Sequence, residues 1–286
     1  MRIDAHQHFW RYRAADYPWI DGSMQAIARD FLPEHLVPEL AQANMDGCIA
    51  VQARHSEEET EFLLGLARAS ASAGGPQVRG VVGWTDLLAD DVDEKLEALA
   101  ADPKLVGLRH IVQDEADDQF LLHPDFQSGV QEAGERGLVY DILVVPRQLD
   151  AAVSFVASLS DQPFVLDHLA KPNIKEQRTD DWQLGFDGLG QFEHVACKLS
   201  GLVTEANWRH WQPADFTRYL DHALEAFGPE RLLFGSDWPV CLLGAADYQE
   251  VYGLLSDWSS RLSDSEQQAL FGGNAVRVYG LDRGDS

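Results

Sequence analysis

The sequence predicts an α/β fold in which eight parallel strands close into a (β/α)8 barrel. Short apolar runs rich in β-branched residues recur along the 286-residue chain. Amphipathic segments of helical length lie between many of these runs, and such alternation is typical of βαβ units. The main alternative, an open doubly wound sheet, is disfavoured because the chain has neither a GxGxxG turn nor a phosphate-binding P-loop pattern.

The predicted strands are apolar runs, and half of them end in polar or titratable residues. Strands that are buried on both faces read as continuous apolar runs rather than alternating ones. Eight runs fit a barrel, which takes about 250 residues. In chain order they are Ile3–His8, Gly47–Ala53, Val78–Trp84, Val106–Val112, Val139–Val144, Phe164–His168, Val195–Ser200 and Leu232–Asp237.

Helices are predicted where apolar residues recur with helical spacing. These segments are Glu57–Ser70, Val92–Ala101, Asp125–Arg136, Ala214–Phe227 and Ala245–Ser256. Ala69–Pro76 and Asn173–Gly190 are predicted as loops from their small and polar residues. Near the end, Ser263 or Asp264 is predicted to cap a short helix, and Phe271–Asn274 to interrupt the chain before a last one. No linker divides the chain, so residues 1–286 are expected to form a single domain.

The chain is strongly acidic and otherwise of ordinary globular composition. Hydrophobic residues make up 45% and charged residues 24%, and 22 Lys and Arg against 47 Asp and Glu give a formal net charge of −25. Such a surface repels phosphate backbones and anionic lipid headgroups. We therefore expect neither nucleic acid nor a membrane as a partner. The composition does not indicate an oligomeric state.

The sequence also predicts a cytoplasmic location. The amino terminus lacks the apolar stretch of a signal peptide, and no run approaches the roughly 18 apolar residues of a membrane span. The three cysteines, Cys48, Cys197 and Cys241, are an odd number at wide spacing. Neither a disulfide framework nor a CxxC metal site is therefore expected.

Titratable residues follow three of the predicted strands. His6 and His8 are two residues apart on the first strand, so their side chains point the same way. His168 ends the sixth strand and Asp237 ends the eighth. Because functional residues of a parallel barrel lie at the carboxyl ends of its strands, these four are expected to meet there. Together they suit one metal ion or one polarised substrate oxygen.

Further candidates for binding a substrate lie at other strand ends. Gln52 and Arg54 share one parity after the second strand, and Lys198 and Ser200 follow the seventh. Arg109 and His110 are adjacent, so strand alternation lets only one of them face inward unless the strand has ended. Tryptophans at the barrel mouth suit stacking on a sugar ring, although core packing is an equal alternative for each; these are Trp10, Trp84 and Trp238.

Six motifs, in order along the whole chain, resemble the amidohydrolase superfamily. The resemblance is to its amidohydrolase-2 branch, in the group of L-fuconolactonases and 2-pyrone-4,6-dicarboxylate lactonases. The histidine pair and the last aspartate mark the superfamily, and His-Phe-Trp, Gly-Leu-Arg-His and Ser-Asp-Trp-Pro point to the sugar-lactone hydrolases. The motifs are Ile3–Trp10, Gly107–His110, Leu166–Pro172, Lys198–Leu202, Phe234–Pro239 and Phe271–Ala275.

The resemblance implies a distorted barrel and assigns roles to individual residues. His6, His8, His168 and Asp237 match the metal-ligating positions, and Arg109 matches an arginine that contacts the substrate. Members with two metals carry a bridging carboxylated lysine or glutamate and a fifth-strand histidine. Val139–Val144 contains no histidine, so at most one divalent ion is implied, with zinc preferred. Whether activity requires it stays open, because the group includes members that work without metal.

The implied activity is hydrolysis of a sugar-acid lactone, such as L-fucono-1,5-lactone or a related aldonolactone. In this reading Asp237 activates water, and His168 and His110 help to polarise the carbonyl or stabilise its oxyanion. Gln52, Arg54, Trp84, Arg109 and Trp238 are the candidates for binding the ring. Two alternatives stay open: a metal-dependent decarboxylase of the same branch, and a lactonase for a carboxylated pyrone or muconolactone. The sequence leaves ring size and stereochemistry undetermined.

Overall fold

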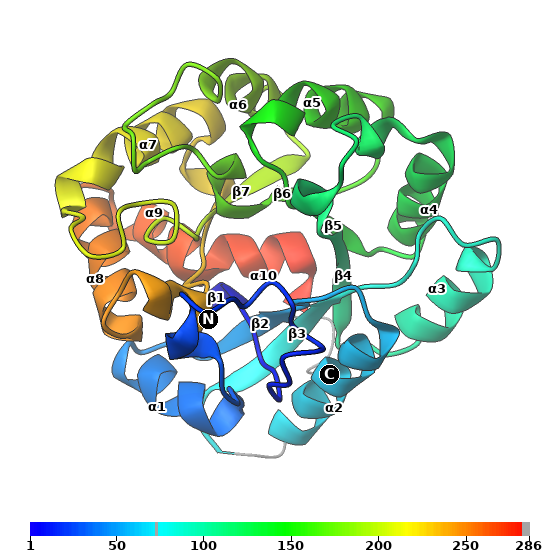
Figure 1. The fold of residues 1–286 in the computed structure, drawn as a ribbon, viewed down its shortest axis with the longest axis horizontal. Coiled ribbons are helices and arrows are strands. Elements are labelled where there is room, and N and C mark those ends of the chain that lie inside the picture. Colours follow the sequence, from blue (N-terminus) through cyan, green and yellow to red (C-terminus); the bar gives the residue numbers. More distant parts are fainter. Residues whose placement is uncertain (72–73, 282–286) are drawn as a thin grey trace.

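The computed structural model describes residues 1–71 and 74–281, which form a nearly closed barrel of parallel strands surrounded by helices (Figure 1). Each strand pairs in parallel with the next along the chain, so the order in the sheet is the order in the sequence. The predicted (β/α)8 barrel is confirmed. Its strands are β1 (Ile3–Gln7), β2 (Gly47–Val51), β3 (Gln77–Gly83), β4 (Leu105–His110), β5 (Val139–Ile142), β6 (Phe164–Leu166), β7 (Val195–Leu199) and β8 (Leu232–Phe234).

The helices lie around the strands in chain order (Figure 1). None of the described helices is long and apolar enough to cross a membrane. They are α1 (Pro33–Gln42), α2 (Glu57–Ser70), α3 (Val92–Ala100), α4 (Pro124–Glu135), α5 (Leu149–Ser158), α6 (Gln183–Gly190), α7 (Pro213–Phe227), α8 (Tyr248–Ser259), α9 (Asp264–Gln268) and α10 (Asn274–Tyr279).

The five predicted helices are present, with bounds within three residues of those expected, and the cap at Ser263 is confirmed because its hydroxyl accepts the Glu266 N–H. The loop expected at Asn173–Gly190 is wrong in its second half, where α6 forms. Glycine has a low helix propensity, so the glycines of this segment argue against a helix when only the sequence is considered. In the structure they let α6 lie close to α5, because a Cβ on Gly185 would be 2.4 Å from the Leu149 Cβ. The loop expected at Ala69–Pro76 includes residues 72–73, which lie outside the described part.

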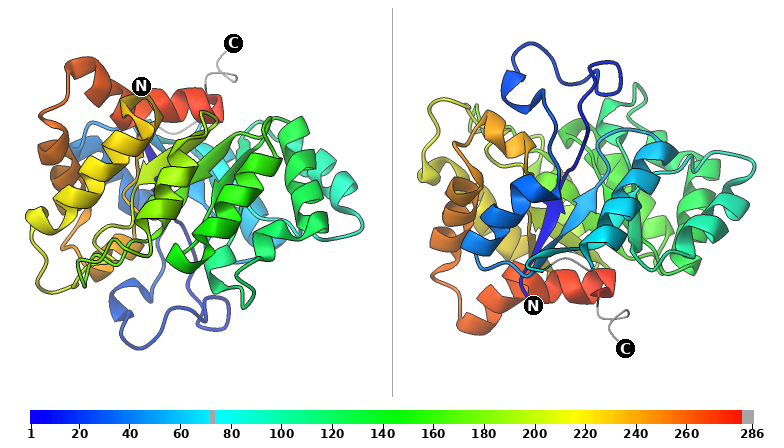
Figure 2. Two further views of the ribbon diagram at one scale, coloured as in Figure 1. Left: turned by 90° about the horizontal axis from the view of Figure 1, so that it is seen from above. Right: turned by 90° about the horizontal axis from the view of Figure 1, so that it is seen from below.

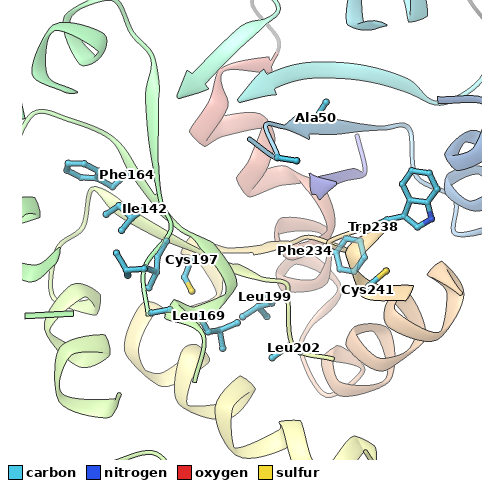
Figure 3. Packing of buried hydrophobic residues seen from close by; sticks show 14 of the residues in the cluster. Ala50, Ile142, Phe164, Leu169, Cys197, Leu199, Leu202, Phe234, Trp238 and Cys241 are labelled. Carbon is cyan, nitrogen blue, oxygen red and sulfur yellow. The ribbon is translucent and has the colours of Figure 1, made fainter. Parts of the chain in front are cut away.

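Two apolar clusters form the core. One lines the barrel interior and takes at least one residue from every strand, together with Ala275 and Tyr279 from α10. The other fills the space between the strands and the helices, and Figure 3 shows part of it around Phe164, Leu199 and Phe234. The interior is therefore a packed core, as in other barrels of this size, and any open site must lie at a strand end.

The two ends of the barrel are covered differently. The segment between β1 and α1 projects from one end, and the N-terminus and α10 lie at the other in both views of Figure 2. Since β1 runs from the N-terminus toward the projecting segment, that segment marks the carboxyl end of the strands.

All eight strands end one to three residues before the predicted end, and the corrections at β6 and β8 matter for the candidate site. The predicted strands ran to His168 and Asp237, whereas β6 ends at Leu166 and β8 at Phe234. His168 has φ 53° and Asp237 has φ 57°. This left-handed region is incompatible with a strand, so both residues lie in turns just beyond the sheet.

Candidate active site

Four polar side chains meet at the carboxyl end of the barrel, from the ends of β1, β6 and β8. His6 Nε2 lies 3.2 Å from His8 Nε2, and Asp237 Oδ1 lies 3.9 Å from the first nitrogen and 3.4 Å from the second. The His168 ring lies beside His6, with 4.4 Å between the ring centroids. Each of these residues is at most 5% exposed.

Backbone hydrogen bonds across the seam of the barrel hold the two histidines of β1 against the segment after β8. The Asp237 N–H donates to His6 O over 2.8 Å, and the His8 N–H donates to Trp238 O over 2.7 Å. The side chains of the site are therefore positioned by the closure of the barrel itself.

Asp4 reinforces this seam with its side chain. Its Oδ1 accepts the N–H of His6 over 3.1 Å and that of Ser236 over 2.9 Å. The register of β1 against β2 shifts between Asp4 and Gln7, and such irregularities redirect the side chains that follow. The buried carboxylate thus satisfies backbone donors at the point where regular pairing fails.

The hydrogen bonds made by the His6 and His8 rings indicate that the acceptor nitrogens of the two rings face each other. His8 Nδ1 lies 2.8 Å from Val51 O, so this nitrogen donates and leaves a lone pair on Nε2. His6 Nδ1 lies 3.2 Å from Asp167 Oδ1, which favours the same tautomer. Two lone pairs and the Asp237 carboxylate then converge within 3.9 Å. Such an arrangement favours a cation, either a metal ion or a proton.

A buried ionic network lies behind His6. Asp167 Oδ2 accepts from Arg109 Nη1 over 2.8 Å, and its Oδ1 lies 3.0 Å from Lys198 Nζ. Arg109 Nη1 also lies 3.3 Å from His6 Nε2, as does Lys198 Nζ from His6 Nδ1. Two cations therefore flank this carboxylate.

The network continues toward the opposite end of the barrel. Lys198 Nζ donates to Asp141 Oδ2 over 2.5 Å, and the Tyr279 hydroxyl donates to Asp141 Oδ1 over 2.8 Å. Lys198 and Asp141 are fully buried. Because Tyr279 belongs to α10, this chain of polar contacts links the helix at the amino end to the site at the carboxyl end.

Electrostatics keep the site in defined protonation states. Burial alone would raise the pKa of Asp237, but the neighbouring His168, His8 and Lys171 hold it below its usual value. Burial lowers the pKa of His6 well below 6.5 and that of His168 to about 4, although nearby carboxylates oppose both changes. At neutral pH the imidazoles of His6 and His168 are therefore neutral and Asp237 is ionised.

The His168 segment is a left-handed turn of four consecutive residues. His168, Leu169, Ala170 and Lys171 have φ between 52° and 57°. Each non-glycine residue in this region costs about 1–2 kcal/mol, and such strain gathers at functional sites. Gly201 leaves room for the turn, since a Cβ there would lie 2.6 Å from His168 Nδ1.

Replacing Ala170 by glycine is expected to test this strain. Ala170→Gly and the control Ala152→Gly, in the middle of α5, each remove one fully buried methyl group. Only the first also relieves a positive φ, so it should leave the protein about 1–2 kcal/mol more stable than the control does. Denaturant unfolding measures both variants, and equal losses would show that the turn is unstrained.

The low pKa of His168 is expected to weaken the metal-free protein in acid. The group has pKa 6.5 when unfolded and about 4 when folded, so between these values the unfolded chain binds more protons and stability falls as pH falls. His168→Asn keeps a residue that tolerates a positive φ but removes this titration. The stability advantage of the original chain over the variant should shrink from pH 7.5 to pH 5 in chelator-treated samples; a constant advantage would contradict the shift.

The structure separates Arg109 from His110, as strand alternation predicts. Arg109 points into the barrel, where its Nη2 donates to Gln52 O and the Gln52 amide donates back to Arg109 O over 3.0 Å. His110 points away from the four-residue cluster: its Nε2 lies 2.8 Å from Glu115, and Trp84 Nε1 donates to its Nδ1 over 3.3 Å. The Arg109 guanidinium is therefore held by protein groups. His110 and Trp84 contact each other and lie apart from the four-residue cluster.

Arg54 does not accompany Gln52, which corrects the expectation that both face one pocket. Its guanidinium lies over the Tyr17 ring, with Nε 3.8 Å from Glu59 and Nη1 3.7 Å from Asp16. The strand β2 has already ended at Val51, so its alternation no longer governs these side chains.

Trp238 is packed in the core rather than displayed at an open mouth. It is 4% exposed, its ring contacts Phe31 at a centroid distance of 5.0 Å, and Phe9 lies 6.2 Å away. Trp10 is fully buried and donates to Arg29 O over 2.8 Å. Both tryptophans are therefore packed in the core, and the stacking of Trp238 on a sugar ring stays a prediction.

Sequence reasoning missed the roles of Asp4, Asp141, Asp167 and Tyr279. A signal was present for the aspartates, because each is a charge within an otherwise apolar strand or at its end. Buried charges require partners, so these positions implied a polar interior. The partners themselves are supplied by distant strands and by α10, and nothing in the local pattern identifies them.

Comparison with known proteins gives full-length matches. The Amidohydrolase family model matches residues 3–281. An L-fucono-1,5-lactonase from Burkholderia multivorans is 48% identical, over 98% of this chain and 96% of its own length. A second L-fucono-1,5-lactonase, from Burkholderia ambifaria, is 36% identical over 99% of this chain and 97% of its own length.

Solved structures agree with this similarity. The crystal structure of an amidohydrolase from Burkholderia multivorans with bound zinc is 47% identical, with a TM-score of 0.91 over 98% of this chain and 99% of that one. A probable 2-pyrone-4,6-dicarboxylic acid hydrolase from Acinetobacter baumannii is 16% identical with a TM-score of 0.78, over 98% of this chain and 99% of that one. The second match shows only a shared fold.

Proposed function

Because the chain belongs to the amidohydrolase family, we propose that it hydrolyses a sugar-acid lactone, with L-fucono-1,5-lactone or a related aldonolactone as substrate. The observation that carries this proposal is the 48% identity to an L-fucono-1,5-lactonase along essentially the whole of both chains. The site supports it chemically, since ester hydrolysis needs a base for water and a polar group at the carbonyl oxygen.

In the proposed mechanism Asp237 accepts a proton from the attacking water. Its carboxylate is ionised at neutral pH because neighbouring imidazoles and Lys171 hold its pKa low. His168 Nδ1 lies 2.9 Å from Ser200 Oγ, which orients the ring. Its Nε2 then faces away from Ser200, where it can hydrogen-bond the carbonyl oxygen. Arg109, fixed by Asp167, contributes positive potential close to the developing oxyanion.

One divalent ion fits the residues present. Two groups of described residues could hold a metal: His6, His8 and Asp237, or His6, Asp167 and His168. The first is preferred, because Asp167 already accepts from Arg109 and Lys198. The three ligand separations of 3.2–3.9 Å are close to the roughly 3.3 Å expected around tetrahedral zinc. A bound zinc ion would polarise the substrate carbonyl or lower the pKa of water.

The purified protein is expected to hold at most one zinc per chain, and His8→Ala should lose it because one of three ligands is removed. Elemental analysis measures the metal, and dialysis against a chelator followed by assay shows whether activity requires it. His123→Ala, which removes an exposed histidine, serves as the control. Two equivalents of zinc, or full retention in His8→Ala, would contradict this site.

The alternatives from the sequence are less well supported. Relatives with lactonase names match at 48% and 36% identity, whereas decarboxylase structures match at 12–13% and show the fold alone. A dicarboxylate substrate needs free cations at the site, but Arg54 and Arg109 are both paired with carboxylates. A cytoplasmic location stays a prediction, supported by the free thiols of the three buried cysteines.

Acid release from a panel of sugar 1,4- and 1,5-lactones, followed with a pH indicator, tests the proposal. Turnover of L-fucono-1,5-lactone or a stereochemical relative above its spontaneous hydrolysis is the expected result. Activity confined to pyrone dicarboxylates, or release of CO2 from aromatic acids, would replace the proposal with one of the alternatives.

A further inference from the structure

A polar cavity of about 310 Å³ opens among the loops that follow β5, β6 and β7, at the carboxyl end of the barrel. Lys171, Asn173, Trp182 and Glu205 are among the residues that line it. The proposed mechanism gives no role to Asn173, Trp182 or Glu205, and it uses Lys171 only for the effect of its charge on Asp237. Lys171 is notable among them because it ends the strained turn that begins at His168.

The turn places Lys171 on the same side as His168. The Lys171 N–H donates to His168 O over 2.8 Å, three residues back along the chain. With about three residues per turn, side chains at positions i and i+3 of such a turn lie one above the other. The left-handed backbone therefore delivers an imidazole and an ammonium group to one side of the chain.

Neighbouring groups hold this turn in its strained form. Trp182 Nε1 donates to Leu169 O over 2.5 Å, and the Leu169 side chain is fully buried in the outer core, where Figure 3 shows it with Cys197 and Leu199. A strained conformation persists only when its surroundings determine it, and its position suggests a function. The strained turn fixes the positions of His168 and Lys171.

An ion pair with Glu205 holds the Lys171 side chain, and Lys171 also acts electrostatically on residues of the site. Its Nζ lies 3.7 Å from Glu205 Oε1, and both side chains are about one quarter exposed, at 23% and 27%. The ammonium group helps to lower the pKa of both His168 and Asp237, and Glu205 also interacts electrostatically with Asp237. Lys171 therefore lines the cavity and also acts electrostatically on His168 and Asp237 of the four-residue cluster.

Opening a lactone leaves one chemical need that the cluster meets poorly. When the ring C–O bond breaks, the electron pair stays on the ring oxygen, and this alkoxide requires a proton. Asp237 holds the proton taken from water, but it lies against His6 and His8. A donor on the cavity side would reach the ring oxygen without moving this carboxylate.

Given the proposed lactonase function, we infer that Lys171 is the catalytic acid for the leaving oxygen and that Glu205 keeps its ammonium group in place. Water attacks the carbonyl carbon and gives one proton to Asp237. The ring C–O bond then breaks and Lys171 Nζ–H donates a proton to the ring oxygen. The resulting amine regains a proton from solvent, Asp237 releases its own, and one lactone and one water yield one hydroxy acid.

The test compares Lys171→Met with Lys171→Arg, whose guanidinium keeps the charge but does not release a proton. Both should lower kcat on the sugar lactone by about 10²–10⁴-fold, the usual contribution of a general acid. On dihydrocoumarin, whose phenolic leaving group needs little protonation, the loss should be under about tenfold by the same reasoning. Lys175→Met, in the next cavity, should match the original enzyme on both substrates.

Chemical rescue gives a second, independent measurement. In Lys171→Cys the new thiol would be accessible, whereas Cys48, Cys197 and Cys241 are all buried. Alkylation with 2-bromoethylamine restores an amine at this position and should recover activity, while iodoacetamide should not. An active Lys171→Arg, equal losses on both lactones, or no recovery after aminoethylation would overturn the inference. An original enzyme that hydrolyses no lactone would instead overturn the proposed function.

Discussion

Asp237→Asn is expected to lower kcat on the sugar lactone by about 10²–10⁴-fold, because the amide cannot accept a proton from water. The substitution preserves size, and asparagine tolerates the φ of 57° found at this position. The loss should therefore come from chemistry rather than from folding. Steady-state kinetics with the same lactone panel measures it, and KM should change much less than kcat.

An exposed aspartate provides the matched control for this change. Asp257→Asn, on the surface of α8, should leave kcat and the melting temperature unchanged. If Asp237→Asn kept most of the activity with an unaltered melting temperature, Asp237 would not be the base. The proton acceptor would then have to be sought among the histidines of the cluster.

Lys198→Met is expected to destabilise the protein by about 3–5 kcal/mol, since removing one partner leaves buried charges uncompensated. Lys198 Nζ contacts Asp141 and Asp167, and all three residues are fully buried. Water cannot solvate the abandoned carboxylates. Denaturant unfolding monitored by tryptophan fluorescence gives the free energy of unfolding.

A second variant separates this electrostatic effect from simple loss of packing. Lys198→Met/Asp141→Asn removes one cation and one anion together, so it should recover a substantial part of the stability lost in the single variant. Lys95→Met, at a half-buried surface lysine beside Glu57 and Asp91, should cost little because exposed ion pairs contribute little. A double variant no more stable than Lys198→Met would show that packing dominates.

The local pattern of the sequence was enough to predict the barrel and the composition of its site. Eight apolar runs recur along the chain with amphipathic segments between many of them, and that alternation corresponds to βαβ units. The two-residue spacing of His6 and His8 was enough to predict that their side chains converge. Because parallel strands end at one edge, the sequence also predicted that His168 and Asp237 would join them.

Local pattern could not predict the conformation of the residues that follow the strands. His168 and Asp237 read as strand ends, but both have positive φ. Hydrogen bonds with distant segments hold both residues in this conformation. Trp182 Nε1 donates to Leu169 O, and the Asp237 N–H donates to His6 O. Backbone propensity describes the conformation that a short segment prefers by itself, whereas these tertiary contacts hold a conformation that the segment does not prefer.

The sequence by itself determined the fold class, the four residues at the strand ends and the resemblance to lactone hydrolases, because periodicity and short motifs are local properties. Only the tertiary structure decided that Arg109 faces inward and His110 outward, that Arg54 pairs with Glu59, and that Trp238 packs in the core. It alone joined Asp141, Lys198 and Tyr279 into one network. The physical reason is that a buried charge needs a partner, and these partners lie on strands and a helix far apart in the chain, so their pairing exists only once the barrel has closed.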